Sequence, residues 1–109
     1  MLKQQIDQDL KTAMLAGDSQ TVSVLRGLKS AIGYAELDAH ARTEGLDDQA
    51  VTQVLAKEAK KRQESADLYK QGGDENRASA ELAEKKIIEK YLQTVSKNVR
   101  HWRQVEMHS

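Results

Sequence analysis

Apolar residues recur at intervals of three to four along most of this chain, and this spacing predicts helices rather than strands. Glycines separate the periodic stretches: Gly17 follows the first, Gly45 lies between the second and third, and Gly72 and Gly73 follow the third. An aspartate stands shortly after each of these breaks, as is typical of a helix N-cap. The pattern predicts four helices, over about residues 2–16, 20–40, 47–71 and 75–92.

The connections between the predicted helices are short, which favours antiparallel neighbours. We therefore expect an all-α fold, an up-and-down bundle of four helices with a short C-terminal helical extension. The expected division is a helical domain over 1–92 and a divergent tail over 93–109. In the tail, Val95, Val99 and Trp102 indicate one further short helix.

The third predicted helix carries charges at the centre of its apolar stripe. At about 100° per residue, one third of the helix circumference holds the following residues: Val51, Leu55, Glu58, Arg62, Ser65 and Tyr69. A stripe that served only the core would have Leu or Ala at its middle. Either the polar members form a buried network with Glu36 of the second helix, or a phosphate or a partner carboxylate binds there.

The preferred interpretation is an interhelix network that sets the register of the bundle. It pairs Arg62 with Glu36, and Glu58 with Arg26 or Lys29, because the second helix offers these side chains on one flank. Such pairing is close to obligatory, since a buried charge without a partner is costly.

Lys57, Lys60 and Lys61 share one flank of the third helix. Three cations on one flank can contact RNA phosphates, although a solvated helix face is the simpler interpretation. Together with Arg26 and Lys29 of the second helix, they form the candidate RNA-binding set.

Composition limits the chemistry. The chain has 109 residues with 17 basic and 17 acidic side chains, so RNA binding would need a local patch rather than a basic surface. There is no Cys, no glycine-rich phosphate loop and no His pair at ligand spacing; we expect no catalytic residue, no metal and no cofactor. No window is apolar enough to span a membrane, and we expect a cytoplasmic location.

Three stretches form an ordered set: LRGLKSAI at 25–32 followed by Glu36, KEAKKRQES at 57–65 followed by Tyr69, and AEKKIIEKYL at 83–92. This set resembles the GatB/YqeY family over about residues 1–92. That family comprises small cytosolic bacterial proteins related to the tail of the B subunit of tRNA-dependent amidotransferases. After the fourth helix the family usually has a Pro, where this chain has Gln93.

The resemblance implies an all-α fold and a link to glutamine-dependent amidation of misacylated tRNA, a carbon–nitrogen ligase reaction with glutamine as amido donor. It implies a non-catalytic tRNA-binding element, and the family positions that map here are Arg26, Lys29, Glu36, Glu58, Arg62 and Ser65. The alternative is a helical module for protein interaction or dimerisation that binds no RNA. The expected partners are tRNA, another protein or a second copy, but neither DNA nor a membrane.

Overall fold

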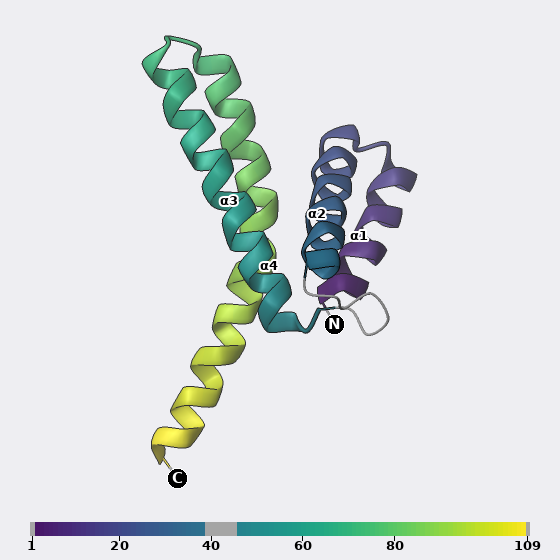
Figure 1. Ribbon diagram of the computed structural model, residues 1–109, viewed down its shortest axis with the longest axis vertical. Helices are drawn as coiled ribbons and strands as arrows, with labels where there is room; N and C mark the ends of the chain where they lie inside the picture. Colours follow the sequence, from purple (N-terminus) through teal and green to yellow (C-terminus); the bar gives the residue numbers. More distant parts are fainter. Residues whose placement is uncertain (1, 39–45, 109) are drawn as a thin grey trace.

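The computed structural model describes the backbone of residues 2–38 and 46–108 and, within these ranges, the side chains up to residue 93. The described chain is all-α and forms two antiparallel helical hairpins that lie side by side (Figure 1). This confirms the predicted fold class and the order of the four helices. The helices are α1 (Leu2–Ala16), α2 (Ser19–Asp38), α3 (Asp48–Gln71) and α4 (Glu75–His108).

The last helix is longer than the sequence pattern predicts. The expected end at Leu92 is wrong, because α4 continues without a break to His108 and runs past the other helices (Figure 1). No Gly or Pro follows Leu92 to terminate the helix. The proposed division into a domain and a tail at residue 92 stays a prediction, and the side chain of Trp102 lies outside the described residues.

Helix starts and ends follow the residue types that the sequence places there. Gly17 and Gly73 adopt φ values of 71° and 78°, the left-handed region in which a residue with a Cβ is strained. Asp18 then accepts hydrogen bonds from the Thr21 amide at 3.2 Å and the Thr21 hydroxyl at 2.7 Å. These bonds, chiefly that from the hydroxyl, lower the pKa of Asp18. Asp47 caps α3 in the same way, since its carboxylate accepts the Ala50 amide at 2.8 Å.

The core joins the two hairpins at their shared end. All four helices contribute buried apolar side chains, and the first residues of α1 and α3 are also linked by the Leu2 amide, which donates to Asp48 Oδ1 at 3.1 Å. Further along the α3–α4 hairpin, the buried residues are Ala66 and Ala78, whose small side chains let the two helices approach closely. The shared cluster comprises Leu2, Ile6, Val24, Leu25, Leu28, Ile32, Val51, Leu55, Ala59, Ile88 and Tyr91.

Candidate functional site

The charged centre of the α3 stripe forms an ion pair within α3. The Arg62 guanidinium donates from Nη1 to Glu58 Oε1 and to the Glu58 carbonyl oxygen, both at 3.2 Å. Both side chains are largely covered, with 17% of Arg62 and 13% of Glu58 exposed. Lys61 reaches the other Glu58 oxygen at 3.1 Å from the solvent side. Glu58 therefore has two cationic partners on its own helix.

The guanidinium of Arg62 packs against α2 at a glycine. A Cβ at Gly27 would lie 3.8 Å from Arg62 Nη2, an ordinary contact distance, so the planar head group lies close to the α2 backbone there. Nε of Arg62 is buried and has no hydrogen-bond partner among the described residues. Ser65 lies half-buried further along the same face of α3. Packing against α2, and not an ion pair between helices, therefore positions the Arg62 guanidinium.

The predicted partners of this group are wrong. Glu36 pairs with Lys3 at 2.7 Å, and Lys29 pairs with Asp7 at 2.8 Å. Glu36 and Lys29 therefore both belong to the seam between α1 and α2. The sequence pattern correctly placed Glu36 and Lys29 on one flank of α2. It did not determine which helix that flank faces, because helical periodicity carries no information about the neighbour.

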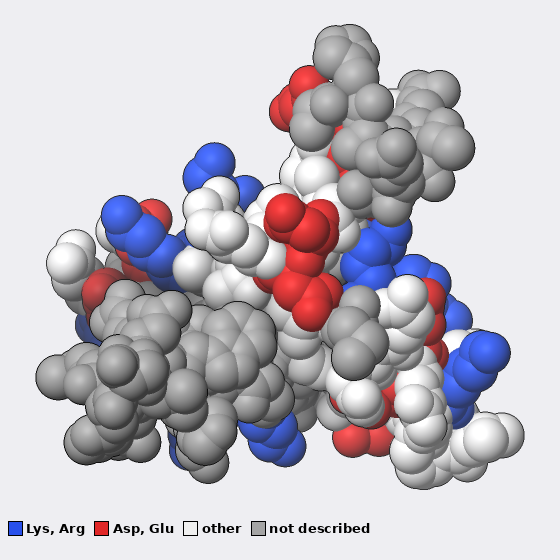
Figure 2. All heavy atoms as spheres, turned by 90° about the horizontal axis from the view of Figure 1, so that it is seen from below, with Lys and Arg blue, Asp and Glu red and all other residues white. Residues whose placement is uncertain are grey.

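The basic flank of α3 borders a shallow groove of about 490 Å³ between α2 and α3. Lys57 and Lys60 are exposed at its edge, and neither forms an ion pair with a described residue. Lys61 differs, because Glu58 holds it. On the face drawn in Figure 2, Lys and Arg side chains gather toward the right-hand side and acidic side chains lie near the centre and among them. The other lining residues are uncharged: Ala35, Leu46, Ala50, Gln53, Val54 and Ala56.

The candidate RNA-binding residues do not form one surface. Lys57 and Lys60 line the α2–α3 groove, whereas Arg26 lines a separate groove at the α1–α2 turn. Lys29 is neutralised by Asp7 on the outer seam of that hairpin. The structure thus keeps Lys57, Lys60 and Lys61 on α3, the last in an ion pair with Glu58, and places Arg26 and Lys29 on other surfaces.

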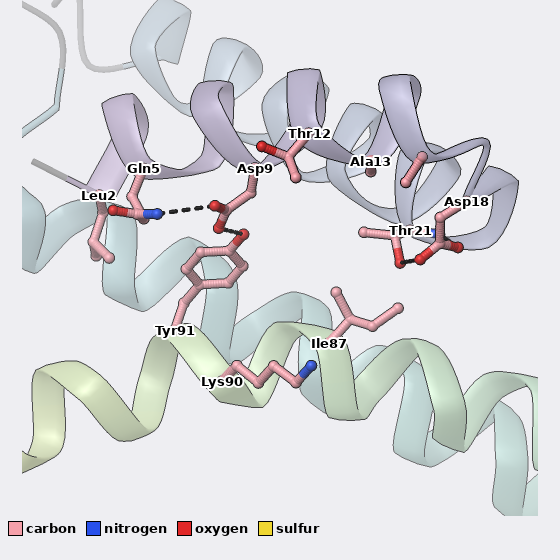
Figure 3. Close-up of a pocket in the computed structure, with 11 residues that line it drawn as sticks. Leu2, Gln5, Asp9, Thr12, Ala13, Asp18, Thr21, Ile87, Lys90 and Tyr91 are labelled. Atoms are coloured by element: carbon pink, nitrogen blue, oxygen red, sulfur yellow. Dashed lines mark hydrogen bonds between the residues drawn. The ribbon is translucent and has the colours of Figure 1, made fainter.

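A cavity of about 570 Å³ between α1 and α4 contains a polar contact that the sequence reasoning missed. Figure 3 shows Tyr91 rising from α4 toward Asp9 on α1, and the Tyr91 hydroxyl donates to Asp9 Oδ2 at 2.5 Å. Gln5 donates to the other Asp9 oxygen at 2.9 Å. Burial, with the hydrogen bond to Asp9, raises the pKa of Tyr91. A Tyr among apolar positions signals a need for a partner, but 17 acids leave the choice open.

The chain matches one known protein family over most of its length. A family described as "Yqey-like protein" matches residues 3–100, which is most of the chain. The chain belongs to the YqeY family. The match runs past residue 92 into the extension of α4.

Similar curated proteins bear the name "Altered inheritance of mitochondria protein 41, mitochondrial". The one from Clavispora lusitaniae is 33% identical over 87 residues, which cover 80% of this YqeY-family chain and 49% of that protein. The Meyerozyma guilliermondii protein is 33% identical over 90 residues, which cover 83% of this chain and 46% of that protein. The Kluyveromyces lactis protein is 34% identical over 86 residues, which cover 79% of this chain and 45% of that protein. The chain spans about half the length of these relatives, and their mitochondrial name differs from the expected bacterial, cytoplasmic setting.

The described part of the YqeY fold contains no group of three or more Asp, Glu, His or Cys side chains that could hold a metal ion. A search of the same residues finds no helix with the length and apolar character needed to cross a membrane. The candidate site features of this YqeY-family chain are the Glu58–Arg62 pair, the α2–α3 groove and the α1–α4 cavity.

Tyr91→Phe should lower the free energy of unfolding by about 1–2 kcal/mol, because Asp9 loses a buried hydrogen-bond donor. Urea unfolding followed by circular dichroism measures this. Tyr34→Phe is the matched control, since 71% of Tyr34 is exposed and its hydroxyl is open to solvent. Equal stability of Tyr91→Phe and wild type would contradict the assigned role.

The same contact predicts a pH dependence. The pKa of Tyr91 in the fold lies above its ordinary value of 10.0, so the protonated phenol contributes stability that is fully present below pH 10. That contribution is lost as pH rises further, because the unfolded chain then releases a proton that the folded chain retains. Tyr91→Phe should accordingly lose less stability than wild type between pH 9 and pH 11 in matched urea titrations.

Proposed function

We propose that this YqeY-family chain is a non-catalytic accessory module that contacts tRNA phosphates, linked to glutamine-dependent tRNA amidotransferases. One observation carries the proposal: Lys57 and Lys60 are exposed on α3 with no acidic partner among the described residues. A cation without a protein counter-ion attracts mobile anions, and release of counter-ions from a bound phosphate then favours association.

The structure narrows the set of residues that we propose for RNA contact. Lys57 and Lys60 are the primary contacts, because neither must give up an ion pair to bind a phosphate. Lys61 is secondary, since its ammonium group already neutralises Glu58. Lys29 is held by Asp7, and we remove it from the proposed contact set. Arg26 lies on another groove and is also removed.

The link to amidotransferases rests on the resemblance of the second, third and fourth helices to the GatB/YqeY family. The chemistry that amidates tRNA belongs to other parts of those enzymes, so the proposed role here is binding and positioning. The lack of Cys supports a reducing compartment such as the cytoplasm. We assign no catalytic step to the described residues.

A fluorescence titration with total tRNA at about 50 mM and 200 mM salt tests the proposal. We expect binding that weakens as salt rises. The Lys57→Gln/Lys60→Gln double variant should bind more weakly at low salt, and the slope of log affinity against log salt should fall by about 2, one for each lost phosphate contact.

Lys29→Gln is the matched control, because it removes a cation that Asp7 already neutralises. We expect its affinity and salt slope to stay close to wild type. Absence of binding at micromolar protein and low salt would refute the proposed function. A loss in Lys29→Gln about half that of the double variant, one charge removed against two, would instead show that net charge, rather than these two side chains, governs binding.

A further inference from the structure

The outer seam between α1 and α2 is a row of ion pairs that stops before the turn. Lys3 pairs with Glu36 at 2.7 Å, and one turn further along α1, Asp7 pairs with Lys29 at 2.8 Å. The next α1 positions, at i+4 and i+7 from Asp7, are Lys11 and Met14, neither of which is acidic. The third turn of the seam therefore has cations without carboxylates.

Arg26 is the α2 cation at this end of the seam. It is exposed and, like Lys11, forms no ion pair with a described residue. Asp18, the acid nearest to Arg26 in the sequence, accepts hydrogen bonds from both the amide and the hydroxyl of Thr21. Its carboxylate also interacts electrostatically with Lys90 of α4. Lys11 and Arg26 are thus two exposed cations without an acidic partner among the described residues, in a chain whose net charge is zero.

Large apolar side chains are exposed beside these cations. Met14 is 52% exposed and Leu15 is 90% exposed, the largest exposed fraction among the large apolar residues of the described chain. Met14 also lines a groove of about 490 Å³ that it shares with Val22 and Arg26. An exposed Met at a groove is typical of surfaces that bind an apolar helix face, since the flexible thioether adapts to its partner.

We propose that this groove at the α1–α2 turn is a docking site for an acidic amphipathic helix of another protein. Apolar side chains of that helix would cover Met14 and Val22, and its flanking carboxylates would pair with Arg26 and Lys11. Such a partner supplies apolar side chains that cover the exposed apolar residues, and it supplies the negative charge that the seam lacks. The proposal is independent of RNA binding at Lys57 and Lys60.

Two other occupants fit the surface less well. RNA phosphates would satisfy Arg26 but would leave Met14 and Leu15 exposed to water. A second copy bound through the same surface would bring two sets of Arg26 and Lys11 together, because a two-fold contact places each surface against itself. The acidic helix is the occupant that matches both the apolar and the charged part.

A designed peptide tests the site directly. The probe is a dye-labelled helix of about 18 residues with Leu at i, i+3, i+4 and i+7 and Glu at the flanking positions. We expect a micromolar dissociation constant by fluorescence anisotropy, weakened about tenfold by Met14→Ser and, separately, by Arg26→Gln. Both substituted side chains are exposed, so circular dichroism should show unchanged helicity.

Lys57→Gln is the matched control variant and should bind the peptide as wild type does. A peptide with Gln in place of Glu should bind about tenfold more weakly. In amide chemical-shift mapping by NMR, the largest changes should fall on residues 11–26. Failure of the Glu peptide to bind, or unchanged affinity in both variants, would overturn the proposal.

The rival occupants give their own results. If Arg26→Gln abolishes tRNA binding while the peptide does not bind, the surface is an RNA contact and the proposal fails. If sedimentation velocity shows a dimer that Met14→Ser dissociates, and the peptide does not compete with it, the occupant is a second copy and the proposal also fails.

Discussion

Leu28→Ala should lower the free energy of unfolding by about 3 kcal/mol, the largest effect that we expect from a single substitution in this chain. Leu28 is 0% exposed and belongs to the cluster that joins the two hairpins, together with Leu55 and Ile88. Removing three buried carbons forfeits their transfer free energy and leaves a cavity that rigid helices cannot close. For a chain of this size the melting temperature should fall by roughly 15 °C.

The matched control is Leu37→Ala on the same helix, where the same atoms are removed from a side chain that is 41% exposed. Its cost should stay below about 1 kcal/mol. Urea unfolding of both variants, followed by circular dichroism at 222 nm, gives the comparison. Similar costs at the two positions would mean that the hairpins do not share the described core.

Arg62→Ala should lower the free energy of unfolding by about 2 kcal/mol, because it removes the more buried of the two cationic partners of a largely covered Glu58. The cost should be smaller than the roughly 3–5 kcal/mol of a fully buried pair, since Lys61 still reaches Glu58 at 3.1 Å. Loss of packing against Gly27 adds to it.

The double variant Glu58→Gln/Arg62→Met separates charge from packing. It removes both charges, keeps a long side chain against Gly27, and eliminates the Arg62 Nε that lacks a partner. We expect stability within about 1 kcal/mol of wild type, as for other ion pairs replaced by apolar groups. Wild-type stability in Arg62→Ala, together with loss of tRNA binding, would support the alternative of a recognition face.

Helix positions and types could be predicted from the sequence because their causes are local. The breaks at Gly17 and Gly73 coincide with positive φ values, and Asp18 and Asp47 cap the helices that follow. The end of the last helix could not be predicted in this way. No terminating residue follows Leu92, and the weaker apolar spacing beyond it was interpreted as a separate short helix.

The candidate site was predicted only in part. Periodicity correctly grouped Glu58 with Arg62 and Lys57 with Lys60, since members of one helix keep fixed relative positions. Contacts between helices were predicted poorly: Glu36 binds Lys3 rather than Arg62, and Asp9 binds Tyr91. A chain with equal numbers of acids and bases offers many chemically equivalent pairings, and local spacing does not distinguish them.

The sequence alone therefore determined the four helices, their caps and the family-like pattern of charges on α3, because short-range geometry dictates each of them. Only the tertiary structure decided which flank of α2 faces α1, that Arg62 rests on Gly27, and that Lys57 and Lys60 have no acidic partner within the described part of the chain. The physical reason is that these outcomes depend on the rotation and register of packed helices. Those are set by the shared core as a whole rather than by any one segment.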